Sequence, residues 1–346
     1  MIVRRFYRIA NEVASIVDKG DFSFSALDGR LGKSSSRTVN EAFRTMMDSL
    51  MDSGRVNSYY RCRSTLRSIV RFDGNEIPFS RVTTSWIRNF DKFLRDEGKS
   101  LTTISIYMKT LRTVLNGACK SGVIKESSCP FGRGRYVIPK GAARSLALTE
   151  EHIRMIMQYK GTGVREKYRD LWLFSYLCNG INFKDMLLLK YRNVVDGEIC
   201  FSRAKTYGAY GGSKLIRAVI TPEMREILRR RGNVPDGNPD TFLFPFADSS
   251  MSPLDISNMV RRVIRLCNSA LGKIAEELGI PKFSTYSARH TFATVLLRKG
   301  VNLNYISESL GHSSLSVTEH YLNGADKSER ERHSRLLTEY ANRMEL

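Results

Sequence analysis

Apolar side chains recur every three or four residues between positions 37 and 128, which is the spacing of amphipathic helices. Four such stretches follow one another, reading VNEAFRTMMDSLMDSG, NSYYRCRSTLRSIVRF, TSWIRNFDKFLRDEG and TTISIYMKTLRTVLNGACKSG. Glycines stop the first stretch at Gly54 and the third at Gly98, and Ser100 or Thr102 is the expected N-cap of the fourth. The pattern predicts a compact helical domain with a core of its own.

Two stretches beside this domain lack its periodicity. Residues 1–36 contain one short helical pattern and the polar run GKSSSRT. We interpret them as an N-terminal segment that is either a flexible lead-in or the remnant of a further module. Residues 129–147 are rich in Pro, Gly and basic side chains, which predicts a basic linker to a second domain.

A second domain is predicted for residues 148–325, where helical and extended patterns are mixed. Thr149 is the expected N-cap of EEHIRMIMQY, and a strongly apolar helix follows near DLWLFSYLCNG. The runs GEICFSRA and KLIRAVIT flank the glycine-rich YGAYGG, which predicts a small antiparallel hairpin. Further helices are expected in PEMREILRRR, SPLDISNMVRRVIRLCNSALGKIAEELG, SARHTFATVLLRKG and NLNYISESLG. The fold class is therefore mainly α with one small antiparallel β-sheet, in two domains, followed by an amphipathic C-terminal tail over 326–346.

The charge of the chain points to a polyanionic partner. The 55 Lys and Arg against 35 Asp and Glu give a net charge of +20. So large a charge makes the folded chain repel itself unless an anion is bound, and nucleic acid is the leading partner class. An anionic membrane surface is the competing interpretation. No apolar run approaches 18 residues and the start resembles no signal peptide, so we expect a cytoplasmic protein that does not span a membrane.

The cysteines and histidines show no metal-binding pattern. The six cysteines stand at positions 62, 119, 129, 178, 200 and 267, without a CxxC pair. The five histidines have no ligand spacing such as HExxH. We therefore expect free thiols in a reducing compartment, no metal ion and no cofactor.

Basic side chains line two of the helices predicted in the first domain. Arg63, Arg67 and Arg71 follow each other at i+4, so they stack along one side of their helix. Like charges in such a row cost a few tenths of a kcal/mol per pair, which a phosphate backbone alongside would relieve. A solvated surface face explains the row equally well. The fourth helix presents a second candidate nucleic-acid surface, consisting of Thr103, Tyr107, Lys109 and Arg112.

Three elements near the C-terminus fit one chemistry. They are Arg289 and His290 in SARHTFAT, His312 in LGH, and Tyr321 nine residues later. Each alone has an ordinary reading as a surface charge, a helix-capping histidine or a packed tyrosine. Together they supply what cleavage of a phosphodiester needs, namely cationic donors for the nonbridging oxygens and a hydroxyl nucleophile. A tyrosine nucleophile would conserve the bond energy, so rejoining needs no ATP.

The run SARHTFATVLLRKGVNLNYISESLGHSSLSVTEHYL resembles the C-terminal signature of the tyrosine recombinase (phage integrase) family. The separations of 23 residues from Arg289 to His312, and of nine to Tyr321, suit that pattern. The helices of 37–128 resemble the family's SAM-like core DNA-binding domain. GEICFSRAKT resembles its strand and turn with a catalytic lysine, which falls on Lys205; a plain hairpin charge is the alternative.

The resemblance implies roles for these residues. Tyr321 is the implied nucleophile, Arg289 and His312 stabilise the developing charge, and Lys205 is the general acid. His290 is implied to orient the site. The fold implied is a two-domain C-shaped clamp.

Two positions depart from the family pattern. Asn182 stands where the first catalytic arginine is usual, and it brings neither charge nor a bidentate fork. Losing one such donor costs about 3–4 kcal/mol of barrier. Tyr286 stands where the second motif usually begins with histidine. The cations that are candidates to replace the missing arginine are Arg165, Arg169, Lys184 and Arg203.

The function implied by the resemblance is site-specific DNA recombination in integration, excision or inversion, by way of a 3′-phosphotyrosyl intermediate. Implied partners are double-stranded DNA, a homotetramer on two recombination sites and accessory DNA-bending proteins. The tail over 326–346 is implied to dock on a neighbouring subunit, with packing on its own domain as the alternative. Two rivals stay open: a DNA-binding protein that has lost catalysis, which Asn182 favours, and a type IB topoisomerase-like enzyme.

Overall fold

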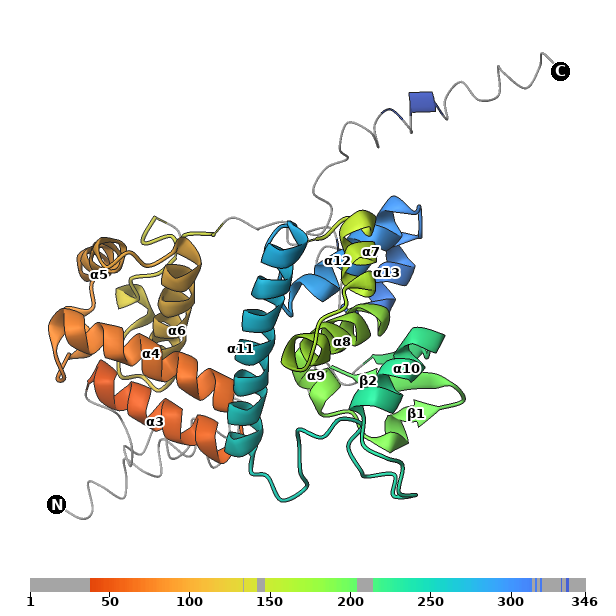
Figure 1. Ribbon diagram of the computed structural model, residues 1–346. Coiled ribbons are helices and arrows are strands. Elements are labelled where there is room, and N and C mark those ends of the chain that lie inside the picture. The colour runs from red at the N-terminus through yellow and green to blue at the C-terminus, as the bar shows by residue number, and fades with distance from the viewer. Residues whose placement is uncertain are drawn as a thin grey trace. The chain divides into compact units, whose positions relative to one another are not determined.

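The structure is a computed structural model in which the chain divides into two compact units, Met1–Ala142 and Ala143–Leu346 (Figure 1). The residues that it describes are 38–132, 134–141, 147–203, 214–312 and the single positions 315, 318, 331, 334 and 335. The predicted N-terminal segment, 1–36, lies outside the described residues, and so does most of the predicted tail, 326–346. Each unit is described by itself.

The described part of the first unit is built from the four helices that the periodicity predicts. Their bounds are α3 Val39–Asp52, α4 Val56–Asp73, α5 Thr84–Asp96 and α6 Leu101–Lys120, with short 3₁₀ turns η1 Phe79–Arg81 and η2 Glu126–Ser128. Side chains cap three of the helix starts. Thr38 and Glu41 form a capping box on α3, Thr83 caps α5, and Ser100 rather than Thr102 caps α6.

The core of the first unit joins the apolar faces of these helices. α4 packs against α3, α5 and α6. Phe72 lies 5.2 Å from Trp86 and 5.3 Å from Phe90 between ring centroids, in tilted and edge-on contacts that aromatic rings favour. Buried side chains from all four helices complete this core: Phe43, Cys62, Ile69, Ile87, Leu94, Ile104, Met108 and Leu111. The predicted helical domain therefore has a core of its own.

Three residues that the sequence pattern assigns to the linker belong to this core. Cys129, Phe131 and Tyr136 are buried in it. The Tyr136 hydroxyl donates a hydrogen bond of 2.6 Å to Asp91 on α5, and burial raises the pKa of that phenol. The stretch carries too few apolar residues to show periodicity, so its packing on α5 leaves no local signal.

The second unit is centred on α8, Val164–Leu177. Helices α10, α11 and α12 all pack against α8, and Trp172 and Phe174 within it are fully buried. The helices around it are α7 Glu150–Gln158, α9 Phe183–Leu187, α10 Pro222–Arg231, α11 Pro253–Leu278, α12 Ser287–Arg298 and α13 Leu303–Ser309, with the 3₁₀ turn η3 Tyr191–Asn193. The helices predicted for this domain are confirmed, including Thr149 as N-cap of α7.

A small antiparallel sheet lies at one side of the second unit. Its strands are β1 Val194–Val195, β2 Glu198–Ser202 and β3 Leu215–Val219, in that order. Cys200 pairs with Arg217 and Ser202 with Leu215. The buried side chains alternate along β2 and β3, which places one face of the sheet on the core. The predicted fold class, mainly α with one small antiparallel sheet, is confirmed.

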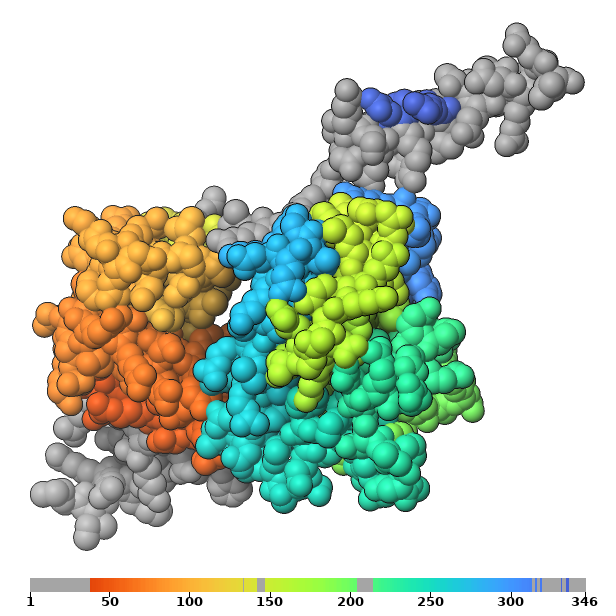
Figure 2. Space-filling view, viewed as in Figure 1, coloured from red at the N-terminus to blue at the C-terminus, as the bar shows by residue number. Residues whose placement is uncertain are grey.

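Helix α11 is amphipathic along its whole length. Met259, Val263, Cys267, Ala270 and Ile274 form its buried stripe. That stripe packs against α7 and α8. In Figure 2 the residues of α7 and α8 lie next to those of α11. Other positions on the helix, including Arg261 and Arg265, carry exposed side chains. Among the described residues, no helix is both long enough and apolar enough to span a bilayer.

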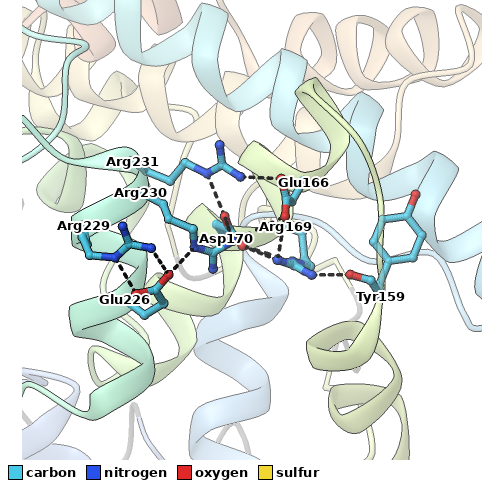
Figure 3. Close-up of polar contacts among 8 residues, drawn as sticks. All are labelled: Tyr159, Glu166, Arg169, Asp170, Glu226, Arg229, Arg230 and Arg231. Atoms are coloured by element: carbon cyan, nitrogen blue, oxygen red, sulfur yellow. Dashed lines mark hydrogen bonds and ion pairs between the residues drawn. The ribbon is translucent and has the colours of Figure 1, made fainter.

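A buried carboxylate ties α8 to α10 (Figure 3). Asp170 is fully buried, and its oxygens lie 2.7 Å from Arg169 Nη2, 3.2 Å from Arg230 Nη1 and 2.7 Å from Arg231 Nε. Glu166, one turn earlier on α8, accepts a further bond of 2.8 Å from Arg231. Three guanidinium groups thus share the fully buried carboxylate of Asp170, and Glu166 gives each of them a second, partly exposed anionic partner.

Asp170→Asn is expected to lower the free energy of unfolding by about 3 kcal/mol, because it removes the fully buried one of the two carboxylates that these arginines share. Denaturant unfolding followed by circular dichroism measures the change. Glu151→Gln is the control, since Glu151 pairs with Arg154 in an exposed i,i+3 contact. It is expected to change stability by less than about 0.5 kcal/mol. Equal effects of the two variants would contradict the structural role of Asp170.

Candidate active site

The start of α12 is anchored to α8 by hydrogen bonds. The indole N–H of Trp172 lies 3.0 Å from the Ser284 carbonyl and 3.2 Å from Ser287 Oγ. The Ser287 hydroxyl in turn donates to the Ser284 carbonyl at 2.7 Å. These bonds fix the first turn of α12, which carries Arg289. The backbone that carries Arg289 is therefore fixed by a contact with the buried helix α8.

Arg289 is buried and is held by backbone carbonyls. Its Nη1 donates to the Gly180 carbonyl at 3.2 Å, and its Nη2 donates to the Leu310 carbonyl. Gly180 has a φ of +62°, and a Cβ there would lie 2.7 Å from the Cα of Arg289. Ser175 on α8 steadies this loop by donating to the Ile181 carbonyl at 2.6 Å. Close approach of Arg289 therefore requires glycine at position 180.

His312 lies against the guanidinium of Arg289. The Arg289 Nη2 is 3.0 Å from His312 Nε2, and His312 Nδ1 is 2.8 Å from Thr318 Oγ1. Since a guanidinium only donates, Nε2 accepts and the ring hydrogen sits on Nδ1, where it is donated to Thr318. Burial, followed by the charges of Arg289 and Arg203, lowers the pKa of His312 to about 3. The imidazole is therefore neutral near pH 7.

Arg203 reaches the same turn from the end of β2. Its Nη1 donates to the Gly311 carbonyl at 3.3 Å, so consecutive carbonyls, at Leu310 and Gly311, bind two arginines. Gly311 has a φ of +61°. A Cβ there would lie 2.5 Å from Ile216 Cδ1 and 3.1 Å from Arg203 Cδ. The turn thus gathers two guanidinium groups and one neutral imidazole, which suits an anionic ligand such as a phosphate.

The other residues predicted for the site have different surroundings. The rings of His290 and Tyr286 meet edge-on at 4.7 Å, and burial followed by the charge of Arg289 lowers the pKa of His290. Tyr286 is half exposed. Asn182 is the N-cap residue of α9, where its side chain makes no capping hydrogen bond. Tyr321 and Lys205 lie outside the described residues.

Two of the four cations considered as replacements for the missing arginine are engaged elsewhere. Arg165 pairs with Glu277, and Arg169 is bound by Asp170 and the Tyr159 carbonyl (Figure 3). Lys184 is an exposed residue of α9. Arg203 is the candidate whose contact with the Gly311 carbonyl brings it to His312.

The predicted arginine row lies on α4 of the first unit. The Arg63 guanidinium stacks on the ring of Tyr60, 4.8 Å from its centroid. Arg71 pairs with Glu97 at 2.8 Å, so its charge is compensated within the protein. Arg67 is exposed. The row therefore offers less uncompensated charge than its sequence spacing predicts.

The second predicted basic surface lies on α6. Lys109 and Arg112 are exposed there, which leaves both charges accessible. Thr103 serves the helix start, since its hydroxyl lies 3.0 Å from Ser100 Oγ. Tyr107 is partly buried against the core. Two of the four predicted side chains thus present charge to solvent.

A further basic surface on α11 was not singled out by the sequence reasoning. It consists of the exposed side chains Arg261, Arg262, Arg265 and Lys273. The run RRVIR in the middle of an amphipathic stretch is the sequence signal for it. The part of the chain that the structure describes holds no group of three or more His, Cys, Asp or Glu side chains that fits a metal ion.

Comparison with known proteins matches each unit to a domain of the phage integrases. The model of the phage integrase SAM-like domain matches residues 38–135, and that of the phage integrase family matches residues 147–328. Each unit therefore matches a domain found in phage integrases. The chain belongs to the phage integrase family, whose members are the tyrosine recombinases.

Relatives of known name and solved structures agree with this assignment. A tyrosine recombinase of Pseudothermotoga lettingae is 30% identical over 77% of this chain and 86% of its own length. Tyrosine recombinase XerC of Thermodesulfovibrio yellowstonii is 28% identical over 72% and 80%. The Tn1549 transposon integrase in complex with a circular intermediate DNA has a TM-score of 0.58 at 17% identity, over 87% of this chain and 99% of that one. A λ integrase dimer bound to a COC′ core site has a TM-score of 0.59 at 19% identity, over 93% and 89%.

The imidazole of His312 is expected to stay neutral down to about pH 4, because its pKa is lowered to about 3. Ring-proton NMR against pH, with the signals assigned by His312→Gln, measures this. The folded pKa lies below the unfolded one, so the unfolded chain binds the proton first. This site therefore lowers the free energy of unfolding as the pH falls from about 6.5 toward 3, by at most about 1.4 kcal/mol per pH unit. A ring titrating near pH 6.5 would contradict the buried contact with Arg289.

Proposed function

We propose that the protein is a site-specific DNA recombinase that cuts and rejoins double-stranded DNA through a 3′-phosphotyrosyl intermediate on Tyr321. The observation that carries the proposal is the turn at 310–312, where Arg289 and Arg203 flank His312. A phosphodiester resists attack because its charge repels nucleophiles. Fixed guanidinium groups at the nonbridging oxygens remove that obstacle. The names of the relatives, tyrosine recombinases, support the same reaction.

Arg289 is the proposed principal donor to the scissile phosphate. Its contacts to Gly180, Leu310 and His312 orient the guanidinium before DNA arrives, so little reorganisation is needed during the reaction. His312 acts as a neutral partner. It keeps the guanidinium in place and itself offers no positive charge to the phosphate.

The covalent step is assigned to residues around this cluster. The Tyr321 hydroxyl attacks phosphorus, the bond to the 5′ oxygen breaks, and Lys205 gives that oxygen a proton. Tyr321 follows Thr318, the hydrogen-bond partner of His312, by three residues in the sequence. The reverse attack by a 5′ hydroxyl of another strand restores the diester and frees the tyrosine. His290 and Tyr286 are assigned supporting roles.

Both units are proposed to bind the DNA backbone. The exposed cations of α4 and α6 serve in the first unit, and those of α11 serve in the second. Lys and Arg that neutralise phosphates release condensed counterions, which favours binding at low salt. A protein acting on DNA in this way belongs in the cytoplasm, associated with the nucleoid.

Recombination exchanges strands between two DNA sites, so we propose a homotetramer as the active assembly. The solved λ integrase assemblies include a dimer bound to a COC′ core site and a tetramer bound to a Holliday junction. In the same proposal the tail over 326–346 docks on a neighbouring subunit, and accessory DNA-bending proteins bring the two sites together.

Tyr321→Phe is expected to abolish a covalent protein–DNA adduct, because the variant keeps the ring and loses the nucleophilic oxygen. Inverted repeats flanking the gene supply candidate sites, prepared as nicked duplexes from which the 5′ fragment diffuses away. Adducts are detected on a denaturing gel. The control variant is Tyr305→Phe, at a half-exposed tyrosine of α13. It is expected to keep the adduct.

Binding without any adduct, at every site tested and over a range of pH, would overturn the proposed reaction. It would show instead a recombinase fold retained for DNA binding. An adduct that survives in Tyr321→Phe would show that another residue is the nucleophile.

Arg67→Ala is expected to weaken DNA binding and to lower the slope of log K against log salt by about 1, because one phosphate contact is lost. Fluorescence anisotropy with a labelled duplex at several salt concentrations measures both quantities. Arg95→Ala is the matched control, since Arg95 is an exposed arginine of the same unit paired with Asp91 at 2.8 Å. An unchanged slope in Arg67→Ala would exclude α4 from the interface.

A further inference from the structure

Asn182 leaves the proposed active site one positive charge short. A pentavalent phosphorus carries charge on two nonbridging oxygens, and a single guanidinium cannot surround both. The amide of Asn182 has no charge, and the neutral imidazole of His312 supplies none. A second cation is therefore required near the Arg289 guanidinium.

Arg203 meets this requirement from a different element. It follows β2, whereas Asn182 begins α9. Its Nη1 contact with the Gly311 carbonyl places it one residue from the Leu310 carbonyl that binds Arg289. The two guanidinium groups thus donate to consecutive carbonyls of one turn.

The packing around Gly311 keeps Arg203 in this position. A Cβ at Gly311 would lie 3.1 Å from Arg203 Cδ and still closer, 2.5 Å, to Ile216. The stem of Arg203 therefore passes over the bare backbone of the glycine. This mirrors Arg289, which passes over the bare backbone of Gly180. Both arginines are oriented by a glycine of positive φ.

The electrostatics of His312 agree with two cations at the turn. Arg289 and Arg203 both lower its pKa, so both guanidinium charges act on the same imidazole. Two like charges held at one turn repel each other. A bound dianion or diester phosphate would relieve that repulsion and gain charge-assisted hydrogen bonds from both.

We propose that Arg203 is a catalytic residue that binds the scissile phosphate and supplies the charge missing at Asn182. The inference rests on the proposed recombinase function. In this proposal the second guanidinium of the site comes from Arg203, which follows β2. It does not come from the start of α9, where Asn182 stands at the usual arginine position.

The first test measures anion binding by the full-length chain and needs no recombination site. Inorganic phosphate is titrated while the ring signals of His312 are followed by NMR. Arg203→Ala is expected to weaken phosphate binding roughly tenfold, because a charge-assisted contact is lost. Arg217→Ala is the matched control on the neighbouring strand β3, where the exposed Arg217 pairs with Glu198 at 3.2 Å. It is expected to bind phosphate as the wild type does.

Equal phosphate affinity in Arg203→Ala and the wild type would overturn the inference. The inference would also be overturned if the NMR signals of His312 in the wild-type protein did not shift on addition of phosphate. Neither result depends on whether Tyr321 forms an adduct, so failure of the recombinase proposal is scored separately, by the adduct assay.

The second test compares two nicked substrates that the wild type cleaves. On the normal phosphodiester, Arg203→Ala is expected to form adduct about 100-fold more slowly or worse, and Arg203→Lys is expected to lose less. The second substrate carries a methylphosphonate at the scissile position, which removes the nonbridging charge. There the deficit of Arg203→Ala is expected to shrink at least about tenfold, because less charge needs stabilising.

A merely structural role for Arg203 gives a different result. Misfolding or a shifted turn would slow both substrates alike. Equal deficits on the phosphodiester and the methylphosphonate would therefore overturn the assignment, and so would cleavage by Arg203→Ala at the wild-type rate.

Discussion

The turn at residues 310–312 is the constraint on which the candidate site depends. A buried guanidinium must have acceptors for its N–H groups, since an uncompensated buried charge is costly. Arg289 finds them in the carbonyls of Gly180 and Leu310 and in the ring of His312. The next carbonyl, of Gly311, accepts from Arg203. One turn of backbone therefore sets the positions of both arginines and of the imidazole between them.

Helix α8 connects the elements around this turn to the rest of the second unit. Asp170 on α8 binds the arginines of α10, Trp172 fixes the start of α12, and Ser175 steadies the loop that contains Gly180. The three side chains lie within two turns, yet they act on three different elements. Because α8 is buried on several sides, movement of any one element would disturb contacts made by the others. The site is thus supported by the central, buried helix of the unit.

Much of this could be predicted from the sequence, because most of it is encoded locally. Helical periodicity located the helices of both units, and the alternating runs around YGAYGG located β2 and β3. Arg289 and His312 were singled out by their residue types and by the resemblance of their motifs to the family signature. Their contact joins residues only 23 positions apart, one on α12 and one in the turn after α13.

What could not be predicted depends on contacts between distant parts of the chain. Arg203 and Gly311 are 108 positions apart, and nothing around Arg203 distinguishes it from Arg165 or Arg169. The compensation of Arg71 by Glu97 likewise depends on how α4 meets the end of α5. Cys129, Phe131 and Tyr136 were assigned to a linker because their burial comes from tertiary packing alone.

The neutral state of His312 determines which side chains of the site can supply positive charge. If the imidazole carried a proton, it would add a cation and make a second arginine less necessary. Its Nε2 accepts from Arg289, however, and a protonated ring has no lone pair there for that purpose. The contact that orients Arg289 therefore requires His312 to remain uncharged. The positive charge among the described side chains of this turn then comes from guanidinium groups. With Asn182 neutral, this is why the proposed second cation is Arg203, whose Nη1 donates to the Gly311 carbonyl next to the carbonyl that binds Arg289.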